Sequence, residues 1–161
     1  MSLQNSDLHQ QMIYKSRLPL YKLFSNINTS FTMEKRVFSP WKWQDKRSYV
    51  QTVEVKNITG TLYCSGQAAI DTNGVSSKED MRSQFQQAIA NLEEVITMAG
   101  YSLGGIVRLN IYTTSMEELW PHFSVLQEWI AQHHIQTALT AMEVKMLFET
   151  LKVELEATVV K

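Results

Sequence analysis

Residues 80–99 read DMRSQFQQAIANLEEVITMA, and this stretch decides the fold. Its apolar side chains recur every three or four residues, which predicts one stripe along a helix: Met81, Phe85, Ile89, Leu92, Val95, Ile96 and Ala99. Overlapping capping boxes at 76–79 and 77–80 mark its start, and Gly100 marks its end. Such a helix is roughly 30 Å long. One apolar face of that length predicts packing against the apolar face of a sheet.

Apolar and alternating runs on both sides of this helix predict five strands. They cover residues 49–55, 61–65, 106–113, 137–144 and 152–160. A second amphipathic helix over 115–132 opens at a Ser115–Glu118 capping box and should begin irregularly, because Pro121 lies near its first turn. We expect the first two strands to pair as a hairpin around the turn at 57–60.

The predicted order is strand, strand, helix, strand, helix, strand, strand. Because crossovers within one sheet are normally right-handed, both helices should cover the same face. Along the last strand, Val153 and Leu155 would face the helices, and Glu154 and Glu156 would face away. We therefore expect the uncovered face to be buried against another subunit.

The composition excludes several classes of protein. With 161 residues, 44% of them hydrophobic, the chain predicts one ordinary domain with an appendage. A net charge of −1 gives no strong field toward nucleic acid or an anionic membrane. The single cysteine, Cys64, excludes an intrachain disulfide and favours a reducing compartment, which we take to be the cytoplasm. The sequence has no apolar run long enough for a membrane span.

The first 32 residues differ from the rest. They lack a periodic apolar face, so we predict a folded domain over 33–161. Residues 1–32 would be a peripheral arm or an extension ahead of a natural start at Met33. The basic residues Lys15, Arg17 and Lys22 also give this segment a weak resemblance to an organelle transit peptide.

Two stretches are candidates for a site. Ser65-Gly66-Gln67 ends a strand, where Gly66 indicates either close approach of a ligand to the backbone or a simple bulge. Glu154 and Glu156 lie two apart, roughly 6–7 Å from each other on one strand face. If the pair is enclosed, the two like charges raise the pKa of one carboxyl group, which suits it for acid–base catalysis. If the pair is open to solvent, it is an ordinary polar strand face. No motif predicts a metal or another cofactor, since the adjacent His133 and His134 cannot share a helix face.

In this order, the segments YVQ (49–51), SGQ (65–67), TAMEV (140–144) and VELEA (153–157) resemble the reactive-intermediate deaminase family, also called Rid, YjgF-like or L-PSP endoribonuclease-like. The resemblance runs from residue 40 to residue 161. It implies an α+β, chorismate-mutase-like fold and a homotrimer with a central β-barrel and helices outside. It further implies inter-subunit clefts in which active members hydrolyse enamines or imines to 2-keto acids without a cofactor.

The resemblance also implies site residues. Glu154 would position water, Tyr49 would shape the pocket, and the backbone at Ser65 and Gly66 would contact the ligand. The predicted pocket also includes Phe123, Leu139, Thr140 and Ala141. Phe123 stands where the family frequently has an asparagine. Leu139 stands where the family has the arginine that binds the substrate carboxylate, and a leucine cannot do so.

Three functions therefore remain open. The first is a divergent trimer that binds a small metabolite, with or without hydrolysing an imine. The second is a true imine deaminase whose cation comes from elsewhere, with Arg108 or Lys145 as candidates. The third is a non-catalytic trimer that binds a ligand or a partner. The charge balance does not support the ribonuclease activity described for some relatives.

Overall fold

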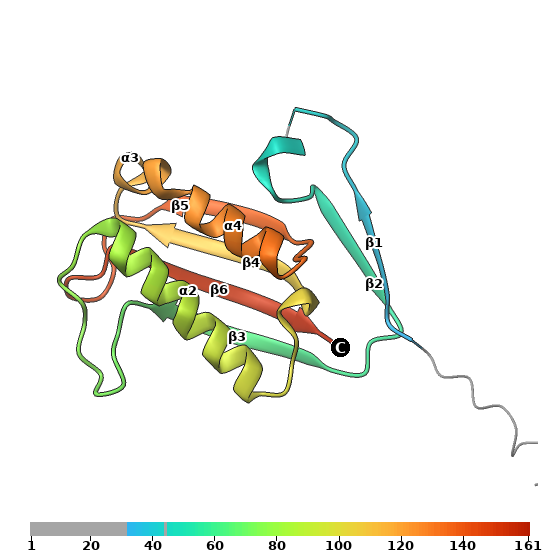
Figure 1. Cartoon of the computed structure of the whole chain (residues 1–161), viewed down its shortest axis with the longest axis horizontal. Coiled ribbons are helices and arrows are strands. Elements are labelled where there is room, and N and C mark those ends of the chain that lie inside the picture. Colours follow the sequence, from blue (N-terminus) through green and yellow to red (C-terminus); the bar gives the residue numbers. More distant parts are fainter. Residues whose placement is uncertain (1–31, 44) are drawn as a thin grey trace, which may run out of the picture. The chain divides into compact units, whose positions relative to one another are not determined.

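The structure, a computed structural model, describes residues 32–43 and 45–161 (Figure 1). The predicted arm, residues 1–32, lies outside the described residues except for Thr32. The strands are β1 (Glu34–Phe38), β2 (Thr52–Lys56), β3 (Thr61–Ala68), β4 (Ile106–Thr113), β5 (Ala138–Glu143) and β6 (Val153–Val160). The α-helices are α2 (Met81–Met98), α3 (Met116–Leu119) and α4 (Ser124–Gln132). Within the described part, none of the helices combines the length and hydrophobicity that crossing a lipid bilayer requires.

The main sheet is mixed and has four strands in the order β3-β6-β4-β5. β6 is antiparallel to both neighbours, whereas β4 and β5 are parallel. The parallel pair is connected through the α3–α4 segment, since parallel neighbours need a crossover connection. The α+β class with a mixed sheet is thus confirmed.

The helices cover one face of this sheet (Figure 1). Phe85 and Leu92 of α2, Leu126 of α4, and Leu109 and Leu155 of the sheet are fully buried in one core cluster. Burying each such side chain contributes about 1.5–3 kcal/mol. On β6, burial alternates as predicted: the odd-numbered residues 153–159 are buried and the even-numbered ones are half-buried. The sheet therefore has one apolar face under the helices and one polar face.

Both ends of α2 follow from local chemistry. The N-cap is Asp80, whose carboxylate accepts a 2.8 Å hydrogen bond from the backbone N–H of Ser83, and not one of the two serines that begin the capping boxes. An ionised cap is favoured there by the helix dipole. At the other end Gly100, with φ of 73°, donates to Thr97, and Tyr101 donates to Ile96. These two bonds form a Schellman motif, as the glycine predicted.

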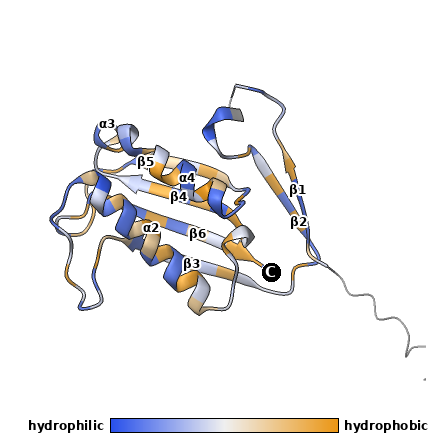
Figure 2. Ribbon diagram, in the orientation of Figure 1, coloured by the Kyte–Doolittle hydropathy of each residue, from blue (hydrophilic) through white to orange (hydrophobic). Residues whose placement is uncertain are grey.

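The buried side of α2 departs from the predicted stripe at Gln84, Ala88, Val95 and Ala99, and Ala88 is fully buried. Val95 and Ala99 are exposed, whereas Gln84 is fully buried (Figure 2 shows α2 in patches of both hydropathies). Gln84 tolerates burial because both the nitrogen and the oxygen of its side-chain amide are hydrogen-bonded. Its amide nitrogen donates to the carbonyls of Ser77, Glu79 and Thr150, and its oxygen accepts from the Lys152 N–H at 2.9 Å.

The predicted hairpin of the first two strands is wrong. β2 pairs instead with β1, a strand that the sequence pattern did not reveal, and β3 pairs with β6. The turn between β2 and β3 is held by the chain end, because the backbone N–H of Gly60 donates to the carbonyl of Lys161 at 3.0 Å. Before β2, Val50 makes a single parallel bridge to Ala138 at the edge of β5.

The second helix begins irregularly, as predicted. The Oγ of Ser115 accepts from the Glu118 N–H at 3.1 Å and starts the one-turn helix α3. A 3-10 turn containing Pro121 follows over Trp120–His122, and α4 then runs to Gln132. This break turns Trp120 and Phe123 toward β5.

Candidate functional site

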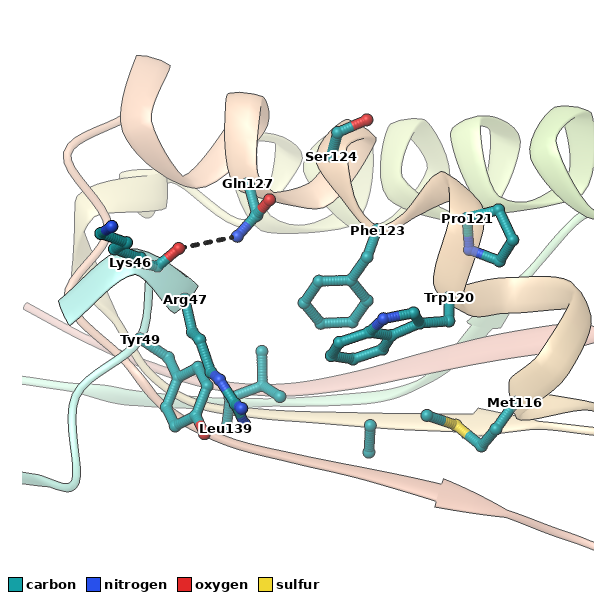
Figure 3. A pocket seen from close by; sticks show the side chains of 11 residues that line it. Lys46, Arg47, Tyr49, Met116, Trp120, Pro121, Phe123, Ser124, Gln127 and Leu139 are labelled. Atoms are coloured by element: carbon teal, nitrogen blue, oxygen red, sulfur yellow. Dashed lines mark hydrogen bonds between the residues drawn. The ribbon is translucent and has the colours of Figure 1, made fainter. Parts of the chain in front are cut away.

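A pocket of about 580 Å³ lies between the start of α4, the edge of β5 and the segment before β2 (Figure 3). It brings together four of the predicted site residues, namely Tyr49, Phe123, Leu139 and Ala141. The other lining residues are Lys46, Arg47, Met116, Trp120, Pro121, Ser124 and Gln127. Its volume is within the range of small-molecule sites.

One wall of the pocket is aromatic. The rings of Trp120 and Phe123 lie 5.2 Å apart between centroids and are tilted by 30°. Phe123 is buried, but Trp120 is 56% exposed, so half of a large indole surface is open for contact. Leu139 and Ala141 continue the apolar lining on β5. A flat, apolar group is what such a wall binds best.

The opposite wall is the segment that precedes β2. The Gln127 side-chain amide donates to the Lys46 carbonyl at 3.2 Å, which joins this segment to α4. The Val50 N–H donates to the Thr137 carbonyl at 3.0 Å, which joins it to the sheet. Between these anchors Ser48 has φ of 62°, a left-handed conformation that costs a non-glycine residue about 1 kcal/mol or more. The surrounding contacts hold the backbone in this strained turn.

Two cations line the pocket, and sequence reasoning missed both. Lys46 and Arg47 belong to the short 3-10 turn Asp45–Arg47. The only signal in the sequence was a basic pair close to Tyr49. The cations proposed from the sequence lie elsewhere: Arg108 donates to the Thr140 hydroxyl at 2.8 Å outside the pocket lining, and Lys145 is exposed in the loop after β5.

Glu154 and Gly66 form a second group of predicted residues. The register of β3 against β6 shifts between Cys64 and Gln67, so Gly66 lies in a bulge. A Cβ on residue 66 would overlap the Glu154 carboxylate. Gly66 thus does permit a close approach to the backbone, but here the approaching group is the Glu154 side chain. Ser65, beside it, is exposed.

The polar face of the sheet carries a hydrogen-bonded cluster next to Glu154. The Tyr112 hydroxyl donates to a Glu156 carboxylate oxygen at 2.7 Å, and the side-chain amide of Asn110 donates to the same oxygen at 3.4 Å. The hydrogen bond to Glu156 raises the pKa of Tyr112 above its ordinary value. The side-chain oxygen of Asn110 is buried without a hydrogen-bond partner.

The predicted residues thus fall into two groups on opposite faces of the sheet. Leu139 and Ala141 pair in register with Leu109 and Ile111 and pack against the core on the helix side. Thr140, between them, points to the polar face with Arg108. Glu154 lies opposite Tyr112 on that face and is not among the residues that line the pocket. One described chain does not bring Leu139 and Glu154 together.

Cys64 takes no part in either group. Its thiol is free and half-buried, and burial raises its pKa. A thiol with a raised pKa carries little thiolate and is a poor nucleophile.

The sequence also matches a family model described as endoribonuclease L-PSP over residues 43–161. The chain belongs to the Rid/YjgF family. Both groups of residues described above fall within the matched segment of this Rid-family protein.

Individual relatives agree with this. A 2-iminobutanoate/2-iminopropanoate deaminase of Salmonella typhimurium is 25% identical over 114 residues, which are 70% of this chain and 87% of that protein. The mitochondrial protein mmf1 of Schizosaccharomyces pombe is 41% identical over 59 residues, 37% of this chain and 36% of its own. The crystal structure of YyfB, a Rid-family protein of unknown function from Yersinia pestis, superposes with a TM-score of 0.70 at 28% identity and covers 79% of this chain and 98% of its own.

Proposed function

We propose that this Rid-family chain forms a homotrimer, with the sheets lining a central barrel, that binds a small metabolite in clefts between its subunits. Slow hydrolysis of an enamine or imine is the reaction that the same clefts would perform. The observation that carries this proposal is the separation of the predicted site residues onto two faces of one sheet. Each group is half of a site, and a second copy of the chain can supply the other half.

The two halves are complementary in chemistry. The pocket at Tyr49 and Leu139 offers a hydrophobic enclosure with cations at one side, but no carboxylate or imidazole among its described lining residues. The polar face at Glu154 offers a carboxylate beside Gly66 and the exposed Ser65. A cleft that joined them would hold a ligand in the pocket and place a base against it.

Glu154 would act on water in such a cleft. Acting on a protonated imine, C=NH2+, an ionised carboxylate can accept a proton from water as the hydroxide adds to the carbon, which gives a neutral carbinolamine. The carboxyl can then return this proton to the nitrogen and take the hydroxyl proton as the carbonyl forms and ammonia leaves. Passing that proton to the ammonia restores the carboxylate. The products are a carbonyl compound and ammonia, so the reaction consumes one water molecule and needs no cofactor. The 25% identity to an imine deaminase supports this reaction class.

Non-catalytic binding is the second candidate, and Leu139 favours it. This residue lies inside the pocket. The resemblance assigns this position to the family's arginine, and a leucine cannot bind a carboxylate. Binding without turnover would then be the whole function. In both cases the partners are a small molecule and two further copies of the chain. We also propose a cytoplasmic location, because the chain has a single cysteine and its thiol is poorly reactive, as suits a reducing compartment.

Sedimentation velocity of the full chain at micromolar concentration tests the assembly. A species of three chains is expected, and a stable monomer would contradict it. Release of pyruvate from 2-iminopropanoate tests the chemistry. We expect slow turnover that Glu154→Gln abolishes, because a neutral amide cannot take the proton.

Glu156→Gln is the matched control, since it makes the same change two residues away on the same strand face. It keeps an acceptor oxygen for Tyr112 and should retain most of the activity. Equal activity of the Glu154→Gln protein and wild type would remove Glu154 from the mechanism. Ligand binding without any turnover by the wild-type trimer would select the non-catalytic candidate.

A further inference from the structure

We propose that Arg47 provides the anion-binding group that Leu139 has lost, and that the ligand is a small carboxylate with an aromatic body, such as the 2-imino or 2-keto acid of an aromatic amino acid. The inference rests on the proposed function, because it names the ligand of the same pocket. It follows from the position of Arg47, from its available donors, and from the size and lining of the pocket.

Arg47 lies where a ligand could reach it. It lines the same pocket as Leu139 and Tyr49, and Figure 3 shows its side chain beside the Tyr49 ring. Its neighbour Lys46 also belongs to the lining, but in the same view the Lys46 side chain lies away from the aromatic wall. Arg47 is thus the cation placed to face a ligand held against Trp120.

The donors of Arg47 are available. Its guanidinium lies over the Trp43 ring, 5.3 Å from the centroid, and stacking of this kind uses the face of the group. The N–H donors point outward in the guanidinium plane and stay available for a two-pronged contact with a carboxylate. Among the side chains that the structure describes, no carboxylate forms an ion pair with Arg47.

The base of the Arg47 side chain is held in place before any ligand arrives. The preceding carbonyl of Lys46 is bonded to Gln127, the next residue is the left-handed Ser48, and Val50 is bonded to Thr137. A backbone fixed on both sides of the residue lowers the entropy lost on binding. The strained turn at Ser48 therefore serves to present Arg47 and Tyr49 to the pocket.

The size and lining of the pocket indicate the rest of the ligand. At roughly 30 Å³ per non-hydrogen atom, the share of a water molecule in the liquid, a volume of about 580 Å³ holds about twenty such atoms. Iminopropanoate has six and would leave the aromatic wall uncovered. A ring on the ligand could stack on Trp120, which is 56% exposed, and contact Leu139 behind it. In this pocket a leucine is therefore useful as a contact for the ring.

Isothermal titration of the full chain with three probes tests the inference. Phenylpyruvate has both the carboxylate and the ring, pyruvate lacks the ring, and phenylacetone lacks the carboxylate. Phenylpyruvate should bind at least tenfold more tightly than either of the others. Arg47→Met should weaken phenylpyruvate binding about 10- to 100-fold, the usual effect of losing a charged hydrogen bond, and leave phenylacetone unchanged.

Three variants serve as controls. Lys46→Met removes the neighbouring charge and should change phenylpyruvate binding less than about threefold, as expected for an exposed charge. Arg47→Lys keeps the charge but loses the planar fork, so its affinity should be intermediate. Arg47→Met combined with Leu139→Arg should recover part of the lost affinity, because the second change restores a guanidinium to the same pocket. Thermal melts confirm that each variant is folded.

The outcomes separate this inference from the proposed function. Equal losses in the Lys46→Met and Arg47→Met proteins, or none in either, would overturn the assignment to Arg47. A trimer that hydrolyses iminopropanoate but does not bind phenylpyruvate would overturn the ligand class and leave the proposed function intact. A monomer that binds phenylpyruvate through Arg47 would overturn the proposed trimer and leave the assignment of Arg47 and the ligand class intact.

Discussion

The carboxylate of Glu154 on β6 occupies the space that a side chain on residue 66 of β3 would need. Gly66 and Glu154 are therefore matched across two neighbouring strands, and a side chain at residue 66 would displace Glu154. The match lies at the bulge in β3, where the strand pairing with β6 shifts register. It gives Glu154 a fixed position on the polar face of the sheet.

Gly66→Ala should destabilise the protein and displace Glu154. The new methyl group overlaps the carboxylate, so one of the two must move, and overpacking of this kind costs about 1–3 kcal/mol. Urea denaturation measures the loss. Gly104→Ala is the control, because a Cβ there would meet its nearest atoms, on His133 and Ser102, at 3.6 Å. Equal stability of the two variants would show that the overlap is relieved without strain.

Gln84→Ala should be among the most destabilising single changes in α2. It removes the partner of the Lys152 N–H and of the Glu79 and Thr150 carbonyls, and it leaves a cavity; the Ser77 carbonyl still accepts from the Thr150 hydroxyl. We expect a loss of about 2–4 kcal/mol in the free energy of unfolding. Gln86→Ala, on the exposed side of the same helix, should change stability by less than about 0.5 kcal/mol. A small effect of Gln84→Ala in urea denaturation would mean that water replaces the amide.

Tyr112 should make stability depend on pH in the alkaline range. Its pKa is raised above the ordinary value of 10.0 in the folded protein, chiefly by the hydrogen bond to Glu156. The folded state therefore binds more protons than the unfolded state above pH 10, so this contribution is complete below pH 10 and is lost as the pH rises through the folded pKa. Denaturation measured from pH 8 to 11 should show a fall that Tyr112→Phe reduces. Tyr63→Phe, which removes a 79% exposed phenol from β3, should not reduce it.

Removing residues 1–32 should leave the folded domain intact. A chain that begins at Met33 keeps every described strand and helix, since β1 begins at Glu34. We expect the melting temperature to change by a few degrees at most. Removal of residues 1–38 is the comparison, because it takes away β1 and the five residue pairs that β1 makes with β2. If the shorter deletion also unfolds the protein, the N-terminal segment contributes to the core.

The sequence predicted those elements whose structure depends on local pattern and caps. The strand over 106–113 has the predicted bounds, and the Gly100 termination of α2 follows from the backbone freedom of one glycine. The pairing of strands that lie far apart in the sequence was harder to predict. β1 was missed because EKRVF is charged at one end and short, and β3 was assigned to the wrong partner because neighbouring strands usually form hairpins.

The candidate site was predictable only in part, for a similar reason. Alternation along β6 places Glu154 and Glu156 on one face, and the structure agrees. Alternation along β5 likewise separates Leu139 from Thr140, which a linear motif conceals. Arg47 could not be found by either rule. It lies in an irregular turn, where no periodicity applies, and reaches the pocket through the left-handed conformation of Ser48.

The separation of the two groups of predicted site residues onto opposite faces of the sheet has a genetic consequence under the proposed function. If each working cleft takes Arg47 from one subunit and Glu154 from its neighbour, a chain with Arg47→Ala and a chain with Glu154→Gln are defective in different halves. Coexpressed in equal amounts, they would form mixed assemblies in which roughly a quarter of the clefts combine the two intact halves. Two defective alleles would then complement each other within one assembly, whereas two copies of either allele alone would not.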